Sequence, residues 1–493
     1  MKTILLLAAL LVPSLLPAAN DIEPIRVQIS GEPSSLDPAL ITDVSGYLIA
    51  SNVYLGLFYL DAQGKLRNGL AESYEMKNGG KLFRFRLKKN IYWSDGKPVQ
   101  IADFVFALKR TLDPATAARD VSYLFSIKGA RKYYKDKTGE LGIREKNGAL
   151  EIELEQPDAA LLQVLSMPLA APLRPDFWPE GKWKAGAPST GHYRISSVEK
   201  GQKILLVPNE KNPSTGQLPV MFFVIPDETI AANMLETGRM DVTSSLPLLD
   251  LPRLKKEGWV KSFSSATTSY LGFQLQREPF RGRDARAAVA RAVQKKELVQ
   301  VLGGVDLPAE SYLPPGLAGH GKASAPKESK AASFSGQTLR LGFAGTATNR
   351  TIAEKIQDDL AKRAGIRVTL EPMEWKVYLA SLRSEQAPEL FLLGLSAAFN
   401  DPISHLMVFA PGNSDNYSRN QNAKYAELFQ TVQGLPAGKK RDRAVAQAEK
   451  LLEEETILVP LFYRAQLYGL SPKVKGFAAN PFRMIRLNDL RRE

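Results

Sequence analysis

The amino-acid sequence predicts a mixed α/β fold, because segments with the period of a strand alternate with segments of helical period along the chain. The chain has 493 residues, 44% of which are hydrophobic, and it contains no cysteine. A chain of this length that forms no disulfide must rely on a large hydrophobic core. Its length alone suggests about three domains.

The first clear strand and helix patterns lie between residues 81 and 157. KLFRFRLKK (81–89) alternates apolar and basic residues, as a half-buried strand does, and ALEIELEQP (149–157) has the same alternation. Between them, IADFVFALKRTLDP (101–114) carries apolar residues at helical spacing and stops before Pro114. We therefore expect two strands with a helix between them.

Helices alternate with strands again in the C-terminal half. DARAAVARAVQKKELVQVLGG (284–304) is predicted to be a single helix that Asp284 caps and a pair of glycines ends. TIAEKIQDDLAKRAG (351–365) has the same form and precedes the strand IRVTLEP. RDRAVAQAEKLLEEE (441–455) precedes the apolar strand TILVPLFY.

One further strand ends in a way that draws attention to function. FLLGLSAAFNDP (391–402) is a short apolar run bounded by turn residues, so it is predicted to be a buried strand that enters a loop. Loops at the ends of buried strands in α/β sheets are common ligand sites. No charged residue stands between Glu389 and Asp401, so any ligand held there meets an uncharged strand end.

The N-terminus has the layout of a secretory signal peptide. MKTILLLAALLVPSLLPAAN (1–20) has a lysine at position 2, an apolar run too short for a typical spanning helix, and small residues before an expected cleavage after Ala19. An uncleaved anchor helix is the alternative. Cleavage predicts a periplasmic protein, and the absence of cysteine excludes an N-terminal lipid anchor on that residue.

The formal charge of +13 is spread along the chain, which does not favour nucleic-acid binding.

Catalytic and metal-binding motifs are missing from the sequence. Only His192, His320 and His405 are present, and their spacing suits neither a metal site nor an HExxH pair. GLSAA (394–398) lacks the last glycine of a nucleophile elbow, and no phosphate-binding glycine loop occurs. A lone His405 is more often a packed residue than a base. These patterns predict a binding protein that needs no metal or cofactor, rather than an enzyme.

Six segments carry a resemblance to a known family: EPSSLDPAL (32–40), LAESYEMKNGGKLFRFRLKKNIYWSDGKPVQIADFVFALKRTLDP (70–114), PSTGHYRI (188–195), LETGRMDV (235–242), YLGFQLQREPFRGRDARAAVARAV (270–293) and LPPG (313–316). With these segments the mature chain resembles, over essentially its whole length, the solute-binding proteins of peptide-type ABC importers. That family, family 5 of the extracellular solute-binding proteins, includes the periplasmic oligopeptide-binding protein. The segment 70–114 is the most specific part of the resemblance.

The resemblance implies a two-lobed periplasmic-binding-protein fold of type II, with a ligand cleft between the lobes. After the leader (1–19), lobe one would comprise residues 20–269 and 471–493, including a family-specific subdomain at roughly 50–180. Lobe two would comprise residues 270–470. Two hinge strands would cross near 270–276 and 461–470. The implied partners are a peptide or peptide-like ligand and an inner-membrane ABC permease, with the binding protein acting as a monomer.

The expected site departs from the family pattern. Relatives place an aspartate, which pairs with the ligand's ammonium, where this chain has Ala398, and often an arginine where it has Leu392. Asn349 falls where the oligopeptide binder has a histidine. Either the ligand carries no free amine at that spot or another acid, such as Asp43, reaches it; Asp401 is expected to cap the following turn. The candidate cleft residues are Thr42, Val44, Tyr270, Asn349, Leu395, Ser396, Ala397, Ala398, Phe399 and Asn400.

Other functions remain open at this point. The same fold could take a non-peptide solute such as a glycan fragment or an opine, although the scarcity of histidines disfavours nickel. A second class is a sensor partner or periplasmic chaperone that does not transport.

The segment GLAGHGKASAPKESKAASFSGQ (316–337), rich in small and polar residues, stands where relatives carry a good helix, and we expect it to be a surface loop.

The substitution Ala398→Asp tests the expected role of the uncharged strand end. A carboxylate there should add about 1.5 to 3 kcal/mol to the binding of a peptide with a free ammonium, as for a hydrogen bond to a charged group. We expect the wild-type protein to discriminate little between free and acetylated peptides in titration calorimetry, and the variant to prefer free amines. A tenfold preference for free amines in the wild type would contradict this interpretation.

Overall fold

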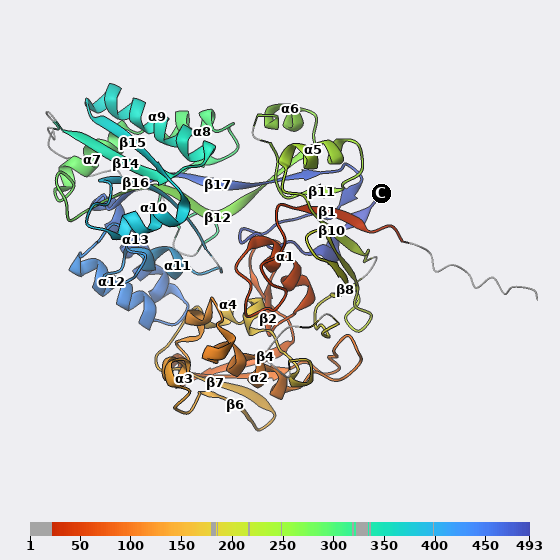
Figure 1. Ribbon diagram of the computed structural model, residues 1–493. Coiled ribbons are helices and arrows are strands. Elements are labelled where there is room, and N and C mark those ends of the chain that lie inside the picture. Colours follow the sequence, from red (N-terminus) through yellow and green to blue (C-terminus); the bar gives the residue numbers. More distant parts are fainter. Residues whose placement is uncertain are drawn as a thin grey trace, which may run out of the picture.

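The computed structural model describes residues 22–178, 184, 186–214, 217–247, 249–317, 320–321, 334, 337–397 and 399–493. The predicted leader and most of the predicted loop at 316–337 lie outside these residues, as does Ala398. The described chain forms a mixed α/β fold with two lobes, which Figure 1 shows to either side of two long strands. No helix among the described residues is both long and apolar enough to cross a membrane.

Two long strands connect the lobes. β12 (Val260–Phe273) and β17 (Leu458–Leu470) pair antiparallel and run from one lobe into the other (Figure 1). They place the strands of both lobes in one 11-stranded sheet, whose main order is β15-β14-β16-β12-β17-β11-β1-β10-β9-β8. The register of the pair shifts between Ser264 and Thr268, so the ladder is irregular in the middle of β12.

The first lobe contains the N-terminal and C-terminal ends of the described chain. Its core is formed mainly by apolar side chains from residues 25–54, 171–224 and 468–490, with Ala107 and Val242. The strands and helices of this lobe are β1 (Ile25–Ile29), α1 (Val44–Val53), β2 (Phe58–Leu60), β3 (Leu66–Asn68), β8 (Tyr193–Glu199), β9 (Lys203–Pro208), β10 (Val220–Val224), α5 (Glu228–Glu236), β11 (Val242–Thr243), α6 (Leu251–Lys256), β18 (Val474–Lys475) and β19 (Arg491–Arg492).

A smaller layer below the first lobe has its own core. A four-stranded antiparallel sheet, in the order β4-β5-β7-β6, is covered by α2, and both predicted strands of the region belong to it. Trp93 is fully buried and its indole N–H donates to Asp103 at 3.1 Å. The elements are β4 (Ala71–Lys77), β5 (Leu82–Leu87), α2 (Ile101–Leu112), α3 (Ala130–Asp136), β6 (Ile143–Lys146), β7 (Ala149–Glu153) and α4 (Leu161–Val164).

The second lobe encloses the largest hydrophobic core, which surrounds the parallel pair β14–β15 and its neighbour β16. Helices cover this part of the sheet (Figure 1). The elements are α7 (Arg283–Ala292), α8 (Lys295–Val301), β13 (Leu307–Pro308), β14 (Thr338–Ala344), α9 (Ala347–Ala364), β15 (Arg367–Met373), α10 (Trp375–Arg383), β16 (Leu390–Ser396), α11 (Ile403–Leu406), α12 (Ala423–Gly434) and α13 (Lys439–Glu454).

The single helix predicted over 284–304 is wrong, because the structure divides it into α7 and α8. Val293 adopts an extended conformation, and the backbone N–H of Gln294 donates to the Asp359 carboxylate on α9 at 2.9 Å. Asp284 is also not the cap, since Gly282 occupies that position. The hydrogen bond from Gln294 to another helix outweighs the local preference for one continuous helix. Periodicity in the sequence gives no information about such a contact between distant residues.

A buried ion pair closes the loop that follows β16. The Arg441 guanidinium makes two bonds to the Asp401 carboxylate, at 2.7 and 2.8 Å, and both side chains are almost fully buried. The same carboxylate accepts the Ile403 N–H at 2.9 Å, so Asp401 caps the following turn as predicted. This pair ties the loop to α13.

Removing one partner of this pair should destabilise the protein strongly. Arg441→Met leaves the Asp401 carboxylate buried without a counter-charge, and we expect the free energy of unfolding to fall by about 3 kcal/mol. Arg443→Met, at an exposed position on the same helix, is the matched control and should change it by less than about 0.5 kcal/mol. Urea unfolding followed by circular dichroism measures both; equal losses would contradict the role of the pair.

Candidate ligand-binding site

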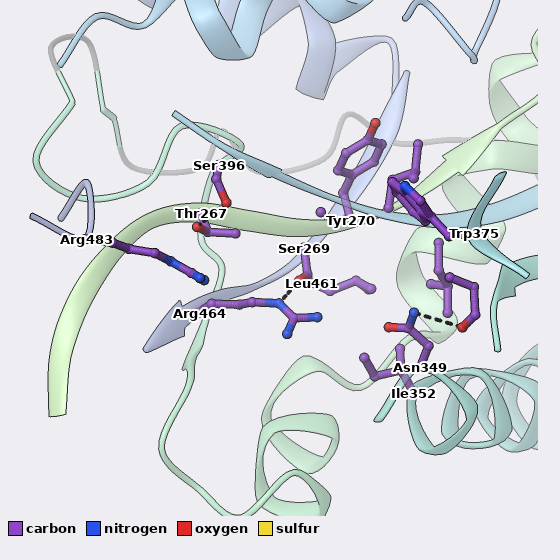
Figure 2. Close-up of a pocket in the computed structure, with 14 residues that line it drawn as sticks. Thr267, Ser269, Tyr270, Asn349, Ile352, Trp375, Ser396, Leu461, Arg464 and Arg483 are labelled. Atoms are coloured by element: carbon purple, nitrogen blue, oxygen red, sulfur yellow. Dashed lines mark hydrogen bonds between the residues drawn. The ribbon is translucent and has the colours of Figure 1, made fainter. Parts of the chain in front are cut away.

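A pocket of about 250 Å³ lies where the two connecting strands meet the second lobe (Figure 2). Strands β12, β14, β16 and β17, helices α9 and α10, and the chain that follows β18 supply its walls. Its lining residues are Thr267, Ser269, Tyr270, Ala344, Asn349, Ile352, Trp375, Leu392, Leu393, Gly394, Ser396, Leu461, Arg464 and Arg483.

Strand register explains why hydroxyl groups gather in this pocket. Thr267 pairs with Ser396 across β12 and β16, and Ser269 lies two residues further along β12, on the same face of the strand. The intervening residue, Thr268, faces the opposite way and donates its hydroxyl to the Tyr312 carbonyl at 2.8 Å. Thr267 and Ser396 share a hydrogen bond of 2.8 Å between their hydroxyls, and Ser265 extends this chain at 2.7 Å.

Two arginines give the pocket its charge. The Arg464 Nε donates to the Ser269 hydroxyl at 3.1 Å, and Figure 2 shows Arg464 and Arg483 entering from the same side. Burial lowers the pKa of Arg464 from its ordinary value, Asp306 raises it, and Arg483 lowers it further. No aspartate or glutamate is among the described lining residues. The pocket is therefore electropositive.

Apolar and amide groups complete the walls. Trp375 is the first residue of α10, and its side chain is 51% exposed although it lines the pocket, so its ring offers a flat apolar surface. Leu461 and Ile352 add smaller apolar surfaces. The Asn349 amide nitrogen donates to the Ala344 carbonyl at 3.0 Å, which fixes the orientation of the side chain.

The structure brings some of the predicted cleft residues together here. Tyr270, Asn349 and Ser396 line the pocket. Thr42 and Val44 lie at the N-terminus of α1, where the Thr42 hydroxyl donates to Ser34, and neither lines the pocket. Asp43, the acid suggested as a replacement, caps α1 by accepting the Gly46 N–H.

The residues after β16 contact the rest of the protein rather than this pocket. Ala397 is buried, and its N–H donates to the Ala266 carbonyl at 2.8 Å. Phe399 packs edge-to-face on Tyr123 of the four-stranded-sheet layer at 5.3 Å between ring centroids, and the Asn400 amide donates to the Gly64 carbonyl at 2.8 Å. Leu395 lies outside the lining. This segment therefore links the two lobes.

Sequence reasoning missed the two arginines, Thr267, Ser269 and Trp375. A signal for one of them existed, since Arg464 is the only charged residue in the 13 residues of β17. A charge inside an apolar strand is costly unless it has a partner or a ligand. Arg483 carried no such signal, because it lies in a turn that only the folded chain brings to the pocket.

A pocket walled by strands that run between two lobes defines a two-lobed binding protein. The sequence matches the family described as "Bacterial extracellular solute-binding proteins, family 5 Middle" over residues 65–417. This chain belongs to that family, whose members are extracellular binding proteins. The expected fold class and family are confirmed.

Relatives span nearly the whole chain. The dipeptide-binding protein DppE of Bacillus subtilis is 26% identical, with 94% of this chain and 90% of DppE covered. The probable deoxycholate-binding periplasmic protein YgiS of Escherichia coli is also 26% identical, with 92% and 90% covered. The fold is similar to the solved structure of the murein tripeptide-binding protein MppA in its unliganded open form, with a TM-score of 0.85. The two sequences are 23% identical, and the match covers 96% of this chain and 98% of the MppA chain.

His405 is a packed residue, as its sequence context suggested. It is fully buried, and its ring lies edge-on to Tyr312 at 5.6 Å between centroids. Burial lowers the pKa of His405 from its ordinary value of 6.5 to about 3. Among the described residues, no cluster of three or more metal-ligating side chains occurs.

This pKa shift predicts a loss of stability in acid. Below pH 6.5 the unfolded chain binds a proton at His405 while the folded protein does not, until the pH reaches about 3. In that window the group should lower the free energy of unfolding by up to about 1.4 kcal/mol per pH unit. The comparison is between wild type and His405→Gln by urea unfolding from pH 7 to 4. As pH falls, the free energy of unfolding of the variant should rise relative to that of the wild type. A difference that stays constant with pH would contradict the lowered pKa of His405.

Proposed function

We propose that this protein is the periplasmic solute-binding component of an ABC importer and that it captures a peptide or peptide-like solute between its lobes. The family membership supports the binding role, and the name of DppE supports a peptide as the ligand. The predicted signal peptide supports the periplasm as the location. An inner-membrane permease would receive the loaded protein, which we expect to act as a monomer.

One observation carries the peptide assignment, namely the open edge of β16. Along β12 this strand pairs continuously from Leu390 to Ser396, but its other edge pairs with β14 only at Leu390 and Phe391. Among the described residues, no strand pairs with that second edge beyond Phe391, although the Leu392 carbonyl accepts the Tyr378 hydroxyl at 2.7 Å. The stretch from Leu392 to Ser396 lines the pocket at four positions. An extended peptide can add to such an edge through main-chain hydrogen bonds.

Closure of the lobes completes this mode of binding. β12 and β17 are the long strands that connect the lobes, and their ladder is irregular between Ser264 and Thr268. Bending at that point would change the angle between the lobes while each core stays intact. We keep the proposed lobe boundaries at residues 269/270 and 470/471, of which the first falls within β12 and the second at the end of β17.

Main-chain recognition can be tested on the peptide itself. Peptides retained by the purified protein are identified by mass spectrometry, and the best one is resynthesised with each backbone amide N-methylated in turn. Loss of one main-chain hydrogen bond, worth about 1 kcal/mol, should weaken binding roughly fivefold at the amides that pair with β16. Replacing the side chains of those same peptide residues with alanine should weaken binding less than methylating their amides. Peptides that bind equally well with every amide methylated would refute the strand-edge mode.

A further inference from the structure

The pocket contains an imbalance of charge that the peptide assignment does not explain. Arg464 and Arg483 both line it, and no carboxylate does so among the described residues. Neither arginine forms an ion pair with a described residue, and the nearest acid acting on Arg464, Asp306, accepts the Ala465 N–H at 2.8 Å instead. Two guanidinium groups thus share a small cavity whose described lining contains no carboxylate, and Asp306, which acts on Arg464, lies outside that lining.

Arg464 is held in place by its strand. It lies on β17, and its Nε donates to the Ser269 hydroxyl on the paired strand β12 at 3.1 Å. Its guanidinium also lies over the Phe462 ring, 5.7 Å from the centroid. Because only Nε is engaged by a hydroxyl, the two terminal nitrogens remain as donors toward the pocket.

Arg483 reaches the pocket through a turn that is fastened to the same strands. The Asn480 side chain accepts the N–H groups of Phe482 and Met484 at 3.0 Å each, which shapes the turn. The Pro481 carbonyl accepts the Ala266 N–H on β12 at 2.8 Å, and the Asn480 carbonyl accepts the Gln466 side chain on β17 at 2.8 Å. The turn is therefore anchored to both connecting strands.

The conformation of Arg483 adds a second, independent observation. Its φ is +63°, a left-handed conformation that costs a residue other than glycine of order 1 kcal/mol or more. Its Nε is buried and has no hydrogen-bond partner among the described residues. A strained backbone that holds an unsatisfied guanidinium nitrogen in a pocket is an arrangement that a ligand would satisfy.

We propose that this pocket binds a carboxylate group of the solute, held between Arg464 and Arg483. The proposal rests on the proposed binding function and specifies the ligand's chemistry. Planar guanidinium groups match a carboxylate with two parallel hydrogen bonds, whereas an ammonium group would face two like charges. The hydrogen-bonded pair of Thr267 and Ser396 hydroxyls leaves one hydroxyl hydrogen as a neutral donor, and Trp375 offers an apolar surface for the adjoining part of the ligand.

The carboxylate has several possible sources, which share this chemistry. It can be the C-terminus of a peptide, an aspartate or glutamate side chain within one, or the carboxylate of an amphipathic acid such as deoxycholate, which the name of YgiS includes.

The experiment therefore offers the protein all three kinds of carboxylate. Immobilised protein is exposed to acetylated peptide pools of two to five residues, half with a free C-terminal acid and half with an amide. Retained peptides are quantified by mass spectrometry, and deoxycholate is tested separately by thermal shift.

We expect peptides with a carboxylate to be enriched at least tenfold over peptides without one. Arg464→Gln and Arg483→Gly should each reduce this enrichment to less than threefold. Arg483→Gly also relieves the left-handed strain, so a loss of binding cannot be ascribed to misfolding if its Tm is unchanged or raised. Arg483→Lys should keep part of the enrichment, and Arg367→Gln, an exposed arginine on β15, is the charge-matched control that should keep all of it.

The outcomes separate this proposal from the proposed function. Peptides retained without any enrichment for a carboxylate would overturn the anion site and leave peptide binding intact. Deoxycholate stabilisation that needs both arginines, with no peptide retained, would overturn the peptide assignment and support the anion site. Enrichment that persists in both arginine variants, or no binding of any carboxylate compound, would overturn the proposal.

Discussion

The pairing of β12 with β17 is the interaction on which the rest of the structure depends. This ladder makes the strands of both lobes parts of one sheet, and β16, which supplies several lining residues of the pocket, pairs directly with β12. Close packing constrains its residues. At Gly469 an added Cβ would lie 2.3 Å from the Thr243 hydroxyl oxygen, and at Gly272 it would lie 2.1 Å from the Phe391 ring. Glycine is required where neighbouring side chains lie so close to the strand backbone.

The C-terminal segment completes the site by returning to the first lobe and fastening itself there. Asn52 on α1 donates to the Ile485 carbonyl at 2.9 Å and accepts the Leu487 N–H at 3.0 Å, although more than 430 residues separate them in sequence. Asn480 donates to the Asp61 carbonyl at 3.2 Å. Because these buried amides satisfy backbone groups, the turn that carries Arg483 has a defined position. The charge of the pocket thus depends on contacts that span the whole chain.

The chemistry of the pocket and the folding of the protein place opposite demands on the same residues. A guanidinium without an ion-pair partner in a small cavity costs free energy, as does a left-handed arginine, so neither feature contributes to stability. The large cores of the two lobes tolerate such local costs, and a bound anion would offset them. The open edge of β16 is a similar feature, since unpaired strand groups are usually covered or charged. Both features suit a protein whose stable closed state includes its ligand.

The sequence by itself determined the family, the mixed fold and most regular elements, because periodicity and turn residues act locally, as at α2, β5 and α13. It also identified Asp401 as a cap and His405 as a packed residue. It could not place the break at Val293, which depends on Asp359 of another helix. Nor could it place Arg464 and Arg483 in one pocket, since 18 intervening residues and a turn anchored to β12 separate them. Only the tertiary structure decided the charge of the site, because distant segments must pack before their side chains can share a cavity.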